Sequence, residues 1–198
     1  MARGPGAGVR VIAGAQRGRR LMVPAGDAVR PTKDIVREAV FSALDARGML
    51  AESAVLDLYA GSGALAIESL SRGATSAVLV ERDALALDAI NHNLEHLGLR
   101  DRARVARANV VSFVSAPPPR EAPFDLVFAD PPYDTSDDAV GELLASLTEP
   151  GWLAAGAMIA VERPAGAEMR VGDGLRACWE RTFGDTLVVF VDVNDSQI

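Results

Sequence analysis

Apolar runs and amphipathic segments alternate along the chain from residue 54 onward. Five short apolar runs predict strands, at 54–59, 76–81, 103–108, 124–129 and 158–163. Between them, apolar residues at helical spacing predict helices, at 61–72, 83–98, 109–115 and 137–147. This alternation predicts a parallel sheet with right-handed crossovers, in which ligands bind at the carboxyl ends of the strands.

The last part of the chain departs from this alternation. Residues 175–183 and 186–193 have the pattern of two strands joined by a turn at Gly184-Asp185, with no helix between them. Such a hairpin adds one antiparallel strand to the parallel sheet. The predicted fold class is therefore α/β: a Rossmann-like, doubly wound sheet of seven strands, mostly parallel, with an antiparallel C-terminal hairpin.

The first part of the chain predicts a small extension of this domain. Residues 9–14 and 19–24 flank a glycine-containing turn, which is typical of a β-hairpin. A helix is expected from about Thr32 onward, because a proline precedes it and apolar residues follow at helical spacing. We therefore expect a basic N-terminal hairpin extension over 1–30 and one main domain over 31–198.

Composition favours a globular protein without membrane or disulfide constraints. Hydrophobic residues make up 49% of the chain, yet no 18-residue uncharged apolar run occurs, so a membrane span is not expected. The first residues hold no apolar block of signal-peptide length. Cys178 is the single cysteine and has no other metal ligands clustered around it, so neither a disulfide nor a metal site is expected. These features predict a cytoplasmic protein.

Charge is distributed unevenly along the chain. The net charge is −7, but residues 1–40 hold eight basic and three acidic side chains, which gives +5 there and leaves −12 for the remainder. A basic segment on an acidic body favours local contact with phosphate groups. All but one of the 20 basic residues are arginine, so only their clustering is informative, and a solvated basic tail is the alternative.

The turn after the first predicted strand combines an acidic residue with two glycines. Gly61 and Gly63 allow the backbone to approach a ligand closely, and Asp57 precedes them on the strand. Glu81 ends the second strand, where a carboxylate accepts hydrogen bonds from ribose hydroxyls. The glycines and Glu81 also suit a nicotinamide dinucleotide, but its pyrophosphate disfavours a carboxylate as near as Asp57. An acidic residue there suits the cationic sulfonium of S-adenosylmethionine, although Asp57 as a cap of the turn is the alternative.

A third strand end adds to the same edge of the sheet. Asn109 follows the strand at 103–108, and its amide suits the adenine edge, with the Val110 N–H as a further donor. Asn109 also suits the N-cap of the short helix that follows, and the two roles are compatible. With the residues adjoining these positions, the predicted cofactor-binding set is Asp57, Tyr59, Ala60, Gly61, Gly63, Glu81, Arg82, Asn109 and Val110.

The fourth predicted strand ends in Asp130-Pro131-Pro132-Tyr133, which we take as the catalytic set. Two prolines remove two backbone donors and fix two φ angles, so this turn is rigid. The Asp130 carboxylate and the Pro131 carbonyl can hold the N–H groups of an exocyclic amine and so turn its lone pair toward a methyl donor. Tyr133 offers a flat face on which an unpaired or flipped base stacks. An ordinary proline-rich β-turn is the alternative.

These motifs resemble class I S-adenosylmethionine-dependent methyltransferases with the amino-methylating [D/N/S]PP[Y/F/W] signature, and among them the bacterial RsmD family. The resemblance lies in VRVIAGAQRGRRLMVP, RPTKDIVREAVFSAL, DLYAGSGALAIESLSRGA, VLVERD and DLVFADPPY, which cover most of residues 9–133. It implies an enzyme that transfers a methyl group from S-adenosylmethionine to N2 of a guanine in 16S rRNA, within the assembled or assembling small ribosomal subunit. Asn109 departs from the pattern, since related enzymes more often have Asp there.

The basic N-terminal segment is the expected contact with RNA. Arginines around the predicted hairpin turn have a spacing that suits phosphates rather than base edges. The first turn of the following helix has free N–H groups that receive a phosphate, although Pro31 and Thr32 also serve simply to begin that helix. The predicted substrate-binding set is Arg10, Arg17, Arg19, Arg20, Arg30, Pro31, Thr32 and Arg37.

Other functions remain open from the residues alone. The same fold can methylate adenine N6 or a protein glutamine amide, and a glutamine acceptor needs no clustered arginines. The glycine pair by itself favours a nicotinamide-dependent oxidoreductase. A non-catalytic RNA-binding module would leave the glycine turn and Asp130–Tyr133 without a use.

Overall fold

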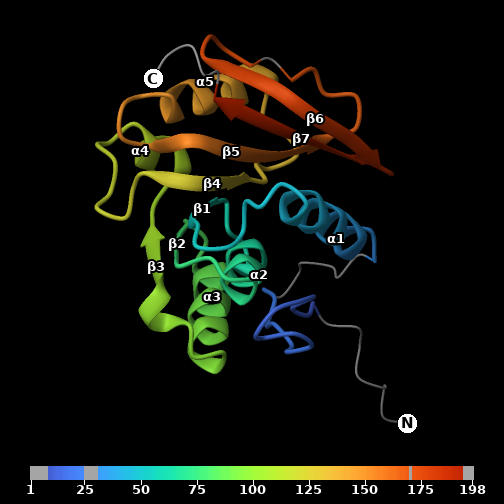
Figure 1. Cartoon of the computed structure of the whole chain (residues 1–198), viewed down its shortest axis with the longest axis vertical. Helices are drawn as coiled ribbons and strands as arrows, with labels where there is room; N and C mark the ends of the chain where they lie inside the picture. Colours follow the sequence, from blue (N-terminus) through green and yellow to red (C-terminus); the bar gives the residue numbers. More distant parts are fainter. Residues whose placement is uncertain (1–8, 25–30, 170, 194–198) are drawn as a thin grey trace.

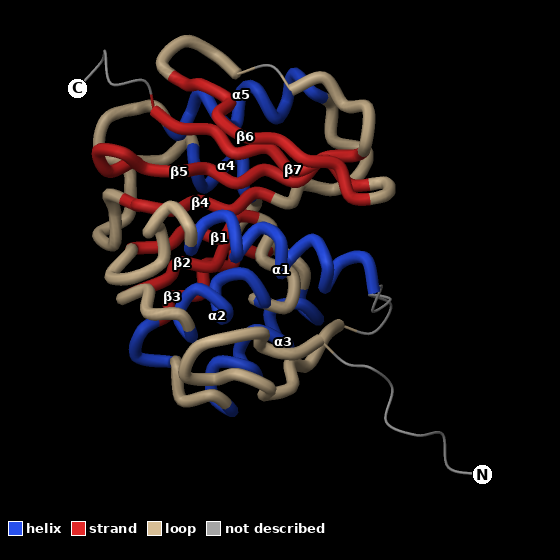
Figure 2. The backbone as a smooth tube through the Cα atoms, turned by 45° about the vertical axis from the view of Figure 1, so that its right-hand side comes forward, coloured by secondary structure: helices blue, strands red, loops and turns tan. Residues whose placement is uncertain are grey.

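The computed structural model describes residues 9–24, 31–169 and 171–193, and within them the chain forms one sheet with helices on both faces (Figures 1 and 2). The sheet has seven strands in the order β3-β2-β1-β4-β5-β7-β6. Their bounds are β1 Ala54–Leu58, β2 Ser76–Glu81, β3 Ala103–Arg107, β4 Phe124–Ala129, β5 Leu153–Pro164, β6 Leu175–Phe183 and β7 Thr186–Val193.

Strands β1 to β5 pair in parallel, and β7 pairs antiparallel with both β5 and β6. The chain builds outward from β1 in one direction through β2 and β3, and returns through β4 and β5 on the other side. The strand order therefore reverses between β1 and β4, which is where open α/β sheets bind ligands. The predicted fold class, including the antiparallel C-terminal hairpin, is confirmed.

Two hydrophobic cores cover the two faces of the sheet. Helices α1, α2 and α3 pack on one face and helices α4 and α5 on the other, as residues of each group belong to separate buried clusters. Their bounds are α1 Pro31–Asp45, α2 Ala64–Ser71, α3 Ala84–His96, α4 Val110–Val114 and α5 Asp137–Leu147, with a short 3₁₀ helix η1 at Arg100–Arg102. Alternate residues of each central strand face the two cores, so those strands are apolar almost throughout.

The predicted N-terminal hairpin forms only in part. Residues 9–24 fold back on themselves with a single antiparallel bridge between Arg10 and Arg20, and neither side of the turn is a regular strand. The reason is that several backbone donors of this segment bind side chains of other elements: Ile12 and Ala13 donate to Glu68, at 2.7 and 2.9 Å. Val11 and Leu21 belong to the core on the α1–α3 face. The predicted boundary after residue 30 lies outside the described residues.

Strand β5 starts earlier than predicted, at Leu153 instead of residue 158. Its first part is Leu-Ala-Ala-Gly-Ala, with Gly156 at φ 75°, and the pairing with β4 shifts register there. Hydrophobic periodicity does not predict this part of the strand, because small residues and a glycine contribute little hydrophobic signal. In the part of the chain that the structure describes, no helix is long and apolar enough to span a membrane.

Candidate active site

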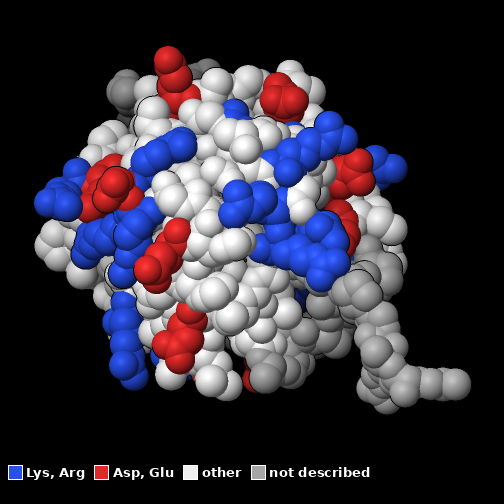
Figure 3. Space-filling view, turned by 90° about the horizontal axis from the view of Figure 1, so that it is seen from below, with Lys and Arg blue, Asp and Glu red and all other residues white. Residues whose placement is uncertain are grey.

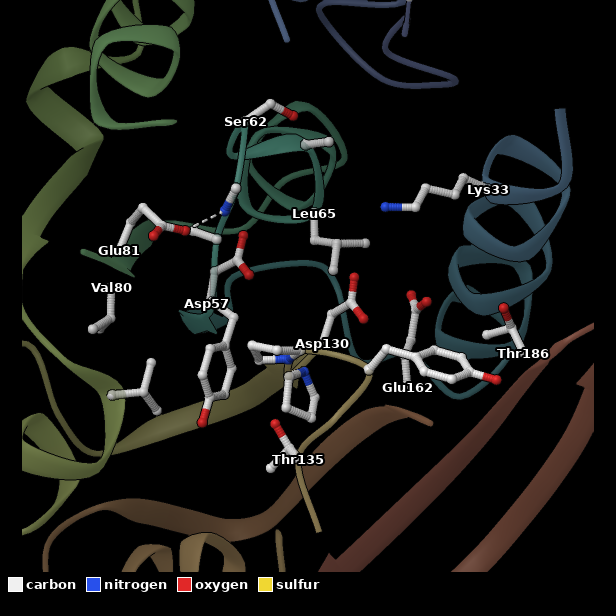
Figure 4. A pocket seen from close by; sticks show the side chains of 18 of the residues that line it. Lys33, Asp57, Ser62, Leu65, Val80, Glu81, Asp130, Thr135, Glu162 and Thr186 are labelled. Carbon is white, nitrogen blue, oxygen red and sulfur yellow. Dashed lines mark hydrogen bonds between the residues drawn. The ribbon is translucent and has the colours of Figure 1, made fainter. Parts of the chain in front are cut away.

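A pocket of about 830 Å³ opens at the carboxyl ends of β1, β2, β4 and β5, at the point where the strand order reverses (Figure 4). The predicted cofactor-binding residues line it, with the exception of Gly63, and so does the whole catalytic set. The glycine turn after β1 and the Asp130–Tyr133 turn after β4 therefore share one pocket. They meet there because β1 and β4 are adjacent parallel strands, with Asp57 opposite Phe128.

The Glu81 side chain fixes the conformation of the glycine turn through hydrogen bonds. One oxygen of its carboxylate accepts from Gly61 N at 2.9 Å, and the other accepts from Arg82 N at 2.7 Å and Asp83 N at 2.9 Å. Tyr59 and Gly61 both have positive φ, of 62° and 54°. A tyrosine in this region costs on the order of 1–3 kcal/mol, so the turn is strained to keep its shape. The carboxylate of β2 thus fixes the loop after β1 in place.

Gly61 and Gly63 have different roles in this turn. A Cβ built on Gly61 would meet only the carbonyl oxygen of Tyr59, at 4.0 Å, so this residue borders open pocket space. Gly63 does not line the pocket, and a Cβ there would lie 2.9 Å from the Leu79 side chain. With φ 77° it begins helix α2. Its smallness serves the packing of α2 on the sheet, and direct contact with a ligand stays a prediction.

Asp57 is buried beneath the glycine turn. Its carboxylate accepts from Ala66 N in the first turn of α2, at 3.1 Å. Burial raises the pKa of Asp57 to about 7, and the negative charges of Asp130 and Glu81 raise it further, while the Ala66 hydrogen bond opposes the shift. Asp57 therefore caps the start of α2 from the pocket wall, and its contact with a bound ligand stays a prediction.

Asn109 caps the short helix α4, as one of its two predicted roles required. Its side-chain oxygen accepts from Ser112 N at 3.3 Å, and the residue is exposed at the pocket rim with Val110 below it. The capping role is confirmed, and contact of the amide with an adenine edge stays a prediction.

The turn that follows β4 presents its aromatic ring to solvent. Pro131 is buried, whereas the Tyr133 ring is 76% exposed at the mouth of the pocket. Thr135 N donates to the Pro132 carbonyl at 2.9 Å and closes the turn. The exposed ring is available for stacking, and its contact with a base stays a prediction.

A buried arginine from β5 fastens this turn from behind. Arg163 donates to the Thr135 carbonyl at 2.7 Å and to the Asp137 carboxylate at 2.8 Å. It is 6% exposed and follows Glu162 at the end of β5. The role of Arg163 was not predictable from the sequence, because nothing in its sequence position indicates which loop a strand-end arginine will reach.

Two charged residues that the sequence analysis did not single out also line the pocket: Glu162 at the end of β5 and Lys33 in the first turn of α1. Figure 4 shows the carboxylates of Asp130 and Glu162 pointing into the same space, with the Lys33 ammonium beside them. Burial raises the pKa of Glu162 to about 8, with a further rise from Asp130 and an opposing effect of Lys33. One available signal was that Lys33 is the single lysine in a chain of arginines.

Four of the predicted substrate-binding arginines lie on the surface. Arg10, Arg17, Arg19 and Arg20 are exposed. Arg19 donates to the His96 carbonyl at 3.1 Å, which places it beside the end of α3. On the face seen in Figure 3, at the end of the molecule where α3 and residues 9–24 lie in Figure 1, Lys and Arg side chains form several groups around a broad neutral surface.

Arg37 differs from the other predicted substrate contacts. It is 6% exposed, and its guanidinium donates to the Arg10 carbonyl at 2.5 Å and to Asp34 at 3.1 Å. Burial is the largest influence on its pKa, which it lowers. Arg37 ties α1 to the N-terminal segment, so its contacts are those of a structural residue at the pocket wall. Arg30 and the side chains of Pro31 and Thr32 lie outside the described residues.

Among the described residues, no group of three or more His, Cys, Asp or Glu side chains is arranged to hold a metal ion. The acidic residues that line the pocket include Asp57, Glu81, Asp130 and Glu162, at the ends of β1, β2, β4 and β5.

Comparison with known proteins agrees with this geometry. The family described as Conserved hypothetical protein 95 matches residues 9–192. The chain belongs to this family, which is the RsmD family. Ribosomal RNA small subunit methyltransferase D of Escherichia coli (strain K12) is 39% identical over 154 residues, which cover 78% of this chain and 74% of that protein. The enzyme of the same name from Haemophilus influenzae (strain ATCC 51907 / DSM 11121 / KW20 / Rd) is 36% identical, over 78% of each chain.

A solved structure within the same range of similarity supports the fold. The Escherichia coli protein yhhF superposes with a TM-score of 0.81 at 34% identity, covering 94% of this chain and 98% of that one. The RsmD resemblance and the methyltransferase class predicted from the sequence are thereby confirmed. The family match over residues 9–192 includes both turns that form the pocket.

Proposed function

We propose that this protein transfers a methyl group from S-adenosylmethionine to the exocyclic N2 of a guanine in 16S rRNA of the small ribosomal subunit, of the type modified at guanine 966. The observation that supports this most directly is the shared pocket, in which the glycine turn after β1 and the Asp130–Tyr133 turn after β4 face one another. A dinucleotide oxidoreductase has no use for the second turn, and an RNA-binding module has no use for either.

The residues of the pocket fit S-adenosylmethionine. Gly61 borders open space where its missing side chain would otherwise intrude, so the backbone can lie against a ligand. Glu81 ends β2 where ribose hydroxyls bind, and Asp57 in its ionised form supplies negative charge for a cationic group. When bound, the cofactor supplies an electrophilic methyl group.

The chain's own residues prepare the amine. The Asp130 carboxylate and the Pro131 carbonyl accept hydrogen bonds from its N–H groups and direct the lone pair into the pocket. Tyr133 stacks on the base, which must be unpaired or flipped, and such stacking contributes ~1–3 kcal/mol. The buried Pro131 and the Arg163 clamp hold the turn in this shape before RNA arrives, so little reorganisation is needed at the reacting atoms.

Two observations support the proposal that the substrate is RNA. The relatives named above are ribosomal RNA methyltransferases by name, and exposed arginines of residues 9–24 suit phosphates. Ribosomal RNA is assembled and modified where ribosomes are made, so we propose action in the cytoplasm.

The decisive experiment is transfer of labelled methyl to small ribosomal subunits that lack the modification, followed by nucleoside analysis. We expect N2-methylguanosine as the labelled product. N6-methyladenosine would instead indicate the adenine acceptor, label in protein would indicate a glutamine acceptor, and no label in either would contradict the proposal. Calorimetry with S-adenosylhomocysteine and with NAD tests the cofactor separately.

Asp130→Ala is expected to abolish turnover in this assay while changing the affinity for S-adenosylhomocysteine little, because the carboxylate acts on the amine and the turn is held by Arg163. Asp138→Ala, an exposed carboxylate in the first turn of α5, is the matched control. Full activity of the Asp130 variant would refute the assigned role.

A further inference from the structure

Glu162 and Lys33 have no part in the mechanism above, yet both face the space where the amine must lie (Figure 4). Strand register explains the position of Glu162. Ala129 pairs with Val161, so the next residues, Asp130 and Glu162, stand side by side at adjacent strand ends.

The alternation of side chains brings these groups to one face of the sheet. Ala129 and Val161 point into the core under α4 and α5, so the residues that follow them turn toward the opposite face, which α1 covers. Lys33 lies in the first turn of α1 and reaches the same space. A cation and two carboxyl groups thus converge from three elements that are distant in sequence.

The chemistry of these groups matches one base edge. Guanine presents an acceptor at O6, a donor at N1–H and donors at the N2 amine. Adenine presents its exocyclic amine beside N1, which is an acceptor and would oppose a carboxylate. A pocket with one ammonium donor and two neighbouring carboxyl acceptors is therefore complementary to guanine and mismatched to adenine.

We propose that Lys33, Glu162 and Asp130 together read the Watson–Crick edge of the target guanine. Lys33 donates to O6, Glu162 accepts from N1–H, and Asp130 accepts from the N2 amine. This inference rests on the proposed function and adds the residues that select guanine. A protonated Glu162 still accepts from N1–H through its carbonyl oxygen, but only the ionised carboxylate rejects a base whose N1 is an acceptor, so the comparison of bases is made at pH 9, above the pKa of Glu162 of about 8.

The test compares guanine with 2-aminopurine, which keeps the 2-amino group but lacks O6 and the N1 proton. The probe is small-subunit rRNA that carries either base at the position that the wild type methylates, and the measurement is single-turnover transfer of labelled methyl. We expect the wild type to prefer guanine by about 10–100-fold, as is typical when buried base-edge hydrogen bonds are lost.

Glu162→Gln is expected to slow transfer to guanine and to bring the preference down to a few-fold, because an amide can donate to the bare N1 of 2-aminopurine. Lys33→Met is expected to slow transfer to guanine alone, since 2-aminopurine has no O6. The matched control is Glu149→Gln, which changes the same chemical group at an exposed position outside the pocket and should retain the wild-type preference.

An unchanged preference in either pocket variant would overturn the inference, whether transfer stays at the wild-type rate or falls equally on both bases. Calorimetric titration of Glu162→Gln with S-adenosylhomocysteine verifies that the pocket is intact, and Lys33→Met tests the reading independently from an exposed position on α1. Failure of the proposed function is separately visible, because the wild type would then form no N2-methylguanosine at all.

Discussion

Two carboxyl groups of the pocket have raised pKa values for the same physical reason. Asp57 and Glu162 are withdrawn from water, which disfavours their charged forms, and Asp130 adds negative charge close to both. Folding alone would favour neutral side chains at these positions. Acidic groups that are held in spite of this cost are typical of sites that bind or react.

At the residue scale we therefore predict that Glu162→Gln stabilises the protein in a pH-dependent way. The folded pKa of Glu162, about 8, lies above its ordinary value of 4.5, so the folded state holds a proton that the unfolded state has released. Wild-type stability consequently falls as the pH rises between these two values, and the variant lacks this loss. The expected gain is on the order of 2 kcal/mol at pH 9, less than the full shift implies because the side chain is partly exposed.

The measurement is thermal unfolding of both proteins at pH 5 and pH 9. The difference between variant and wild type should be small at pH 5 and reach several degrees at pH 9. Glu149→Gln is the control and should show no such change with pH. An equal difference at both pH values would contradict the raised pKa.

At the scale of elements, the conformation of residues 9–24 depends both on the local sequence pattern and on tertiary contacts. Its apolar residues and glycines predict a hairpin, and the chain does turn back on itself. Regular strand pairing stays incomplete because Glu68, Ser71 and Asn93 on α2 and α3 take up its backbone groups. The segment thereby becomes part of the pocket wall, where Val9 and Val23 lie.

Gly14 is the point of closest contact in this docking. A Cβ there would lie 1.8 Å from the Ser71 carbonyl oxygen, whereas Gly18 has nothing within 4 Å, and the two have nearly the same φ, 79° and 80°. Gly14→Ala should therefore cost roughly 2–4 kcal/mol and Gly18→Ala only about 1–2 kcal/mol of backbone strain. Urea unfolding of the two variants measures these losses of stability. Hydrogen exchange at the Ile12 and Ala13 amides measures whether residues 9–24 detach locally from α2. Equal effects of the two substitutions would show that the contact with Ser71 is unimportant.

The bounds of strands and helices were predictable wherever a single pattern of apolar and polar residues runs along the whole element. The bounds of β2, β4, β6, β7 and α5 are those that the sequence predicts. The start of β5 was missed, because alanines and a glycine give no periodic signal. The pattern of apolar residues gives the correct bounds where it continues along the whole element, and it misses the start of β5, which has no such pattern.

At the scale of the whole molecule, charge is segregated. The protein is acidic overall, at −7, while exposed arginines gather on residues 9–24 beside α3. A net negative protein binds RNA only through such a local surface, since the remainder repels phosphates.

We predict that Arg17→Ala, Arg19→Ala and Arg20→Ala together weaken binding to small-subunit RNA and flatten its salt dependence. Each lost phosphate contact should reduce the slope of log affinity against log salt by about 0.7 on single strands and about 0.9 on duplex. The control is the triple variant with alanine at Arg120, Arg176 and Arg181, exposed arginines away from that segment, which changes the net charge equally. Equal slopes for the two triple variants would indicate a general charge effect in place of a docking surface.

The sequence by itself determined the alternation of strands and helices, the antiparallel ending and the two turns for which we propose binding of cofactor and amine, because these are signalled locally by apolar periodicity, glycines and prolines. Only the tertiary structure brought Glu162 and Lys33 to the amine side of the pocket and turned Arg37 inward as a structural residue. The physical reason is that strand register and helix packing set which side chains share a space, and neither is encoded in the spacing of residues along one element.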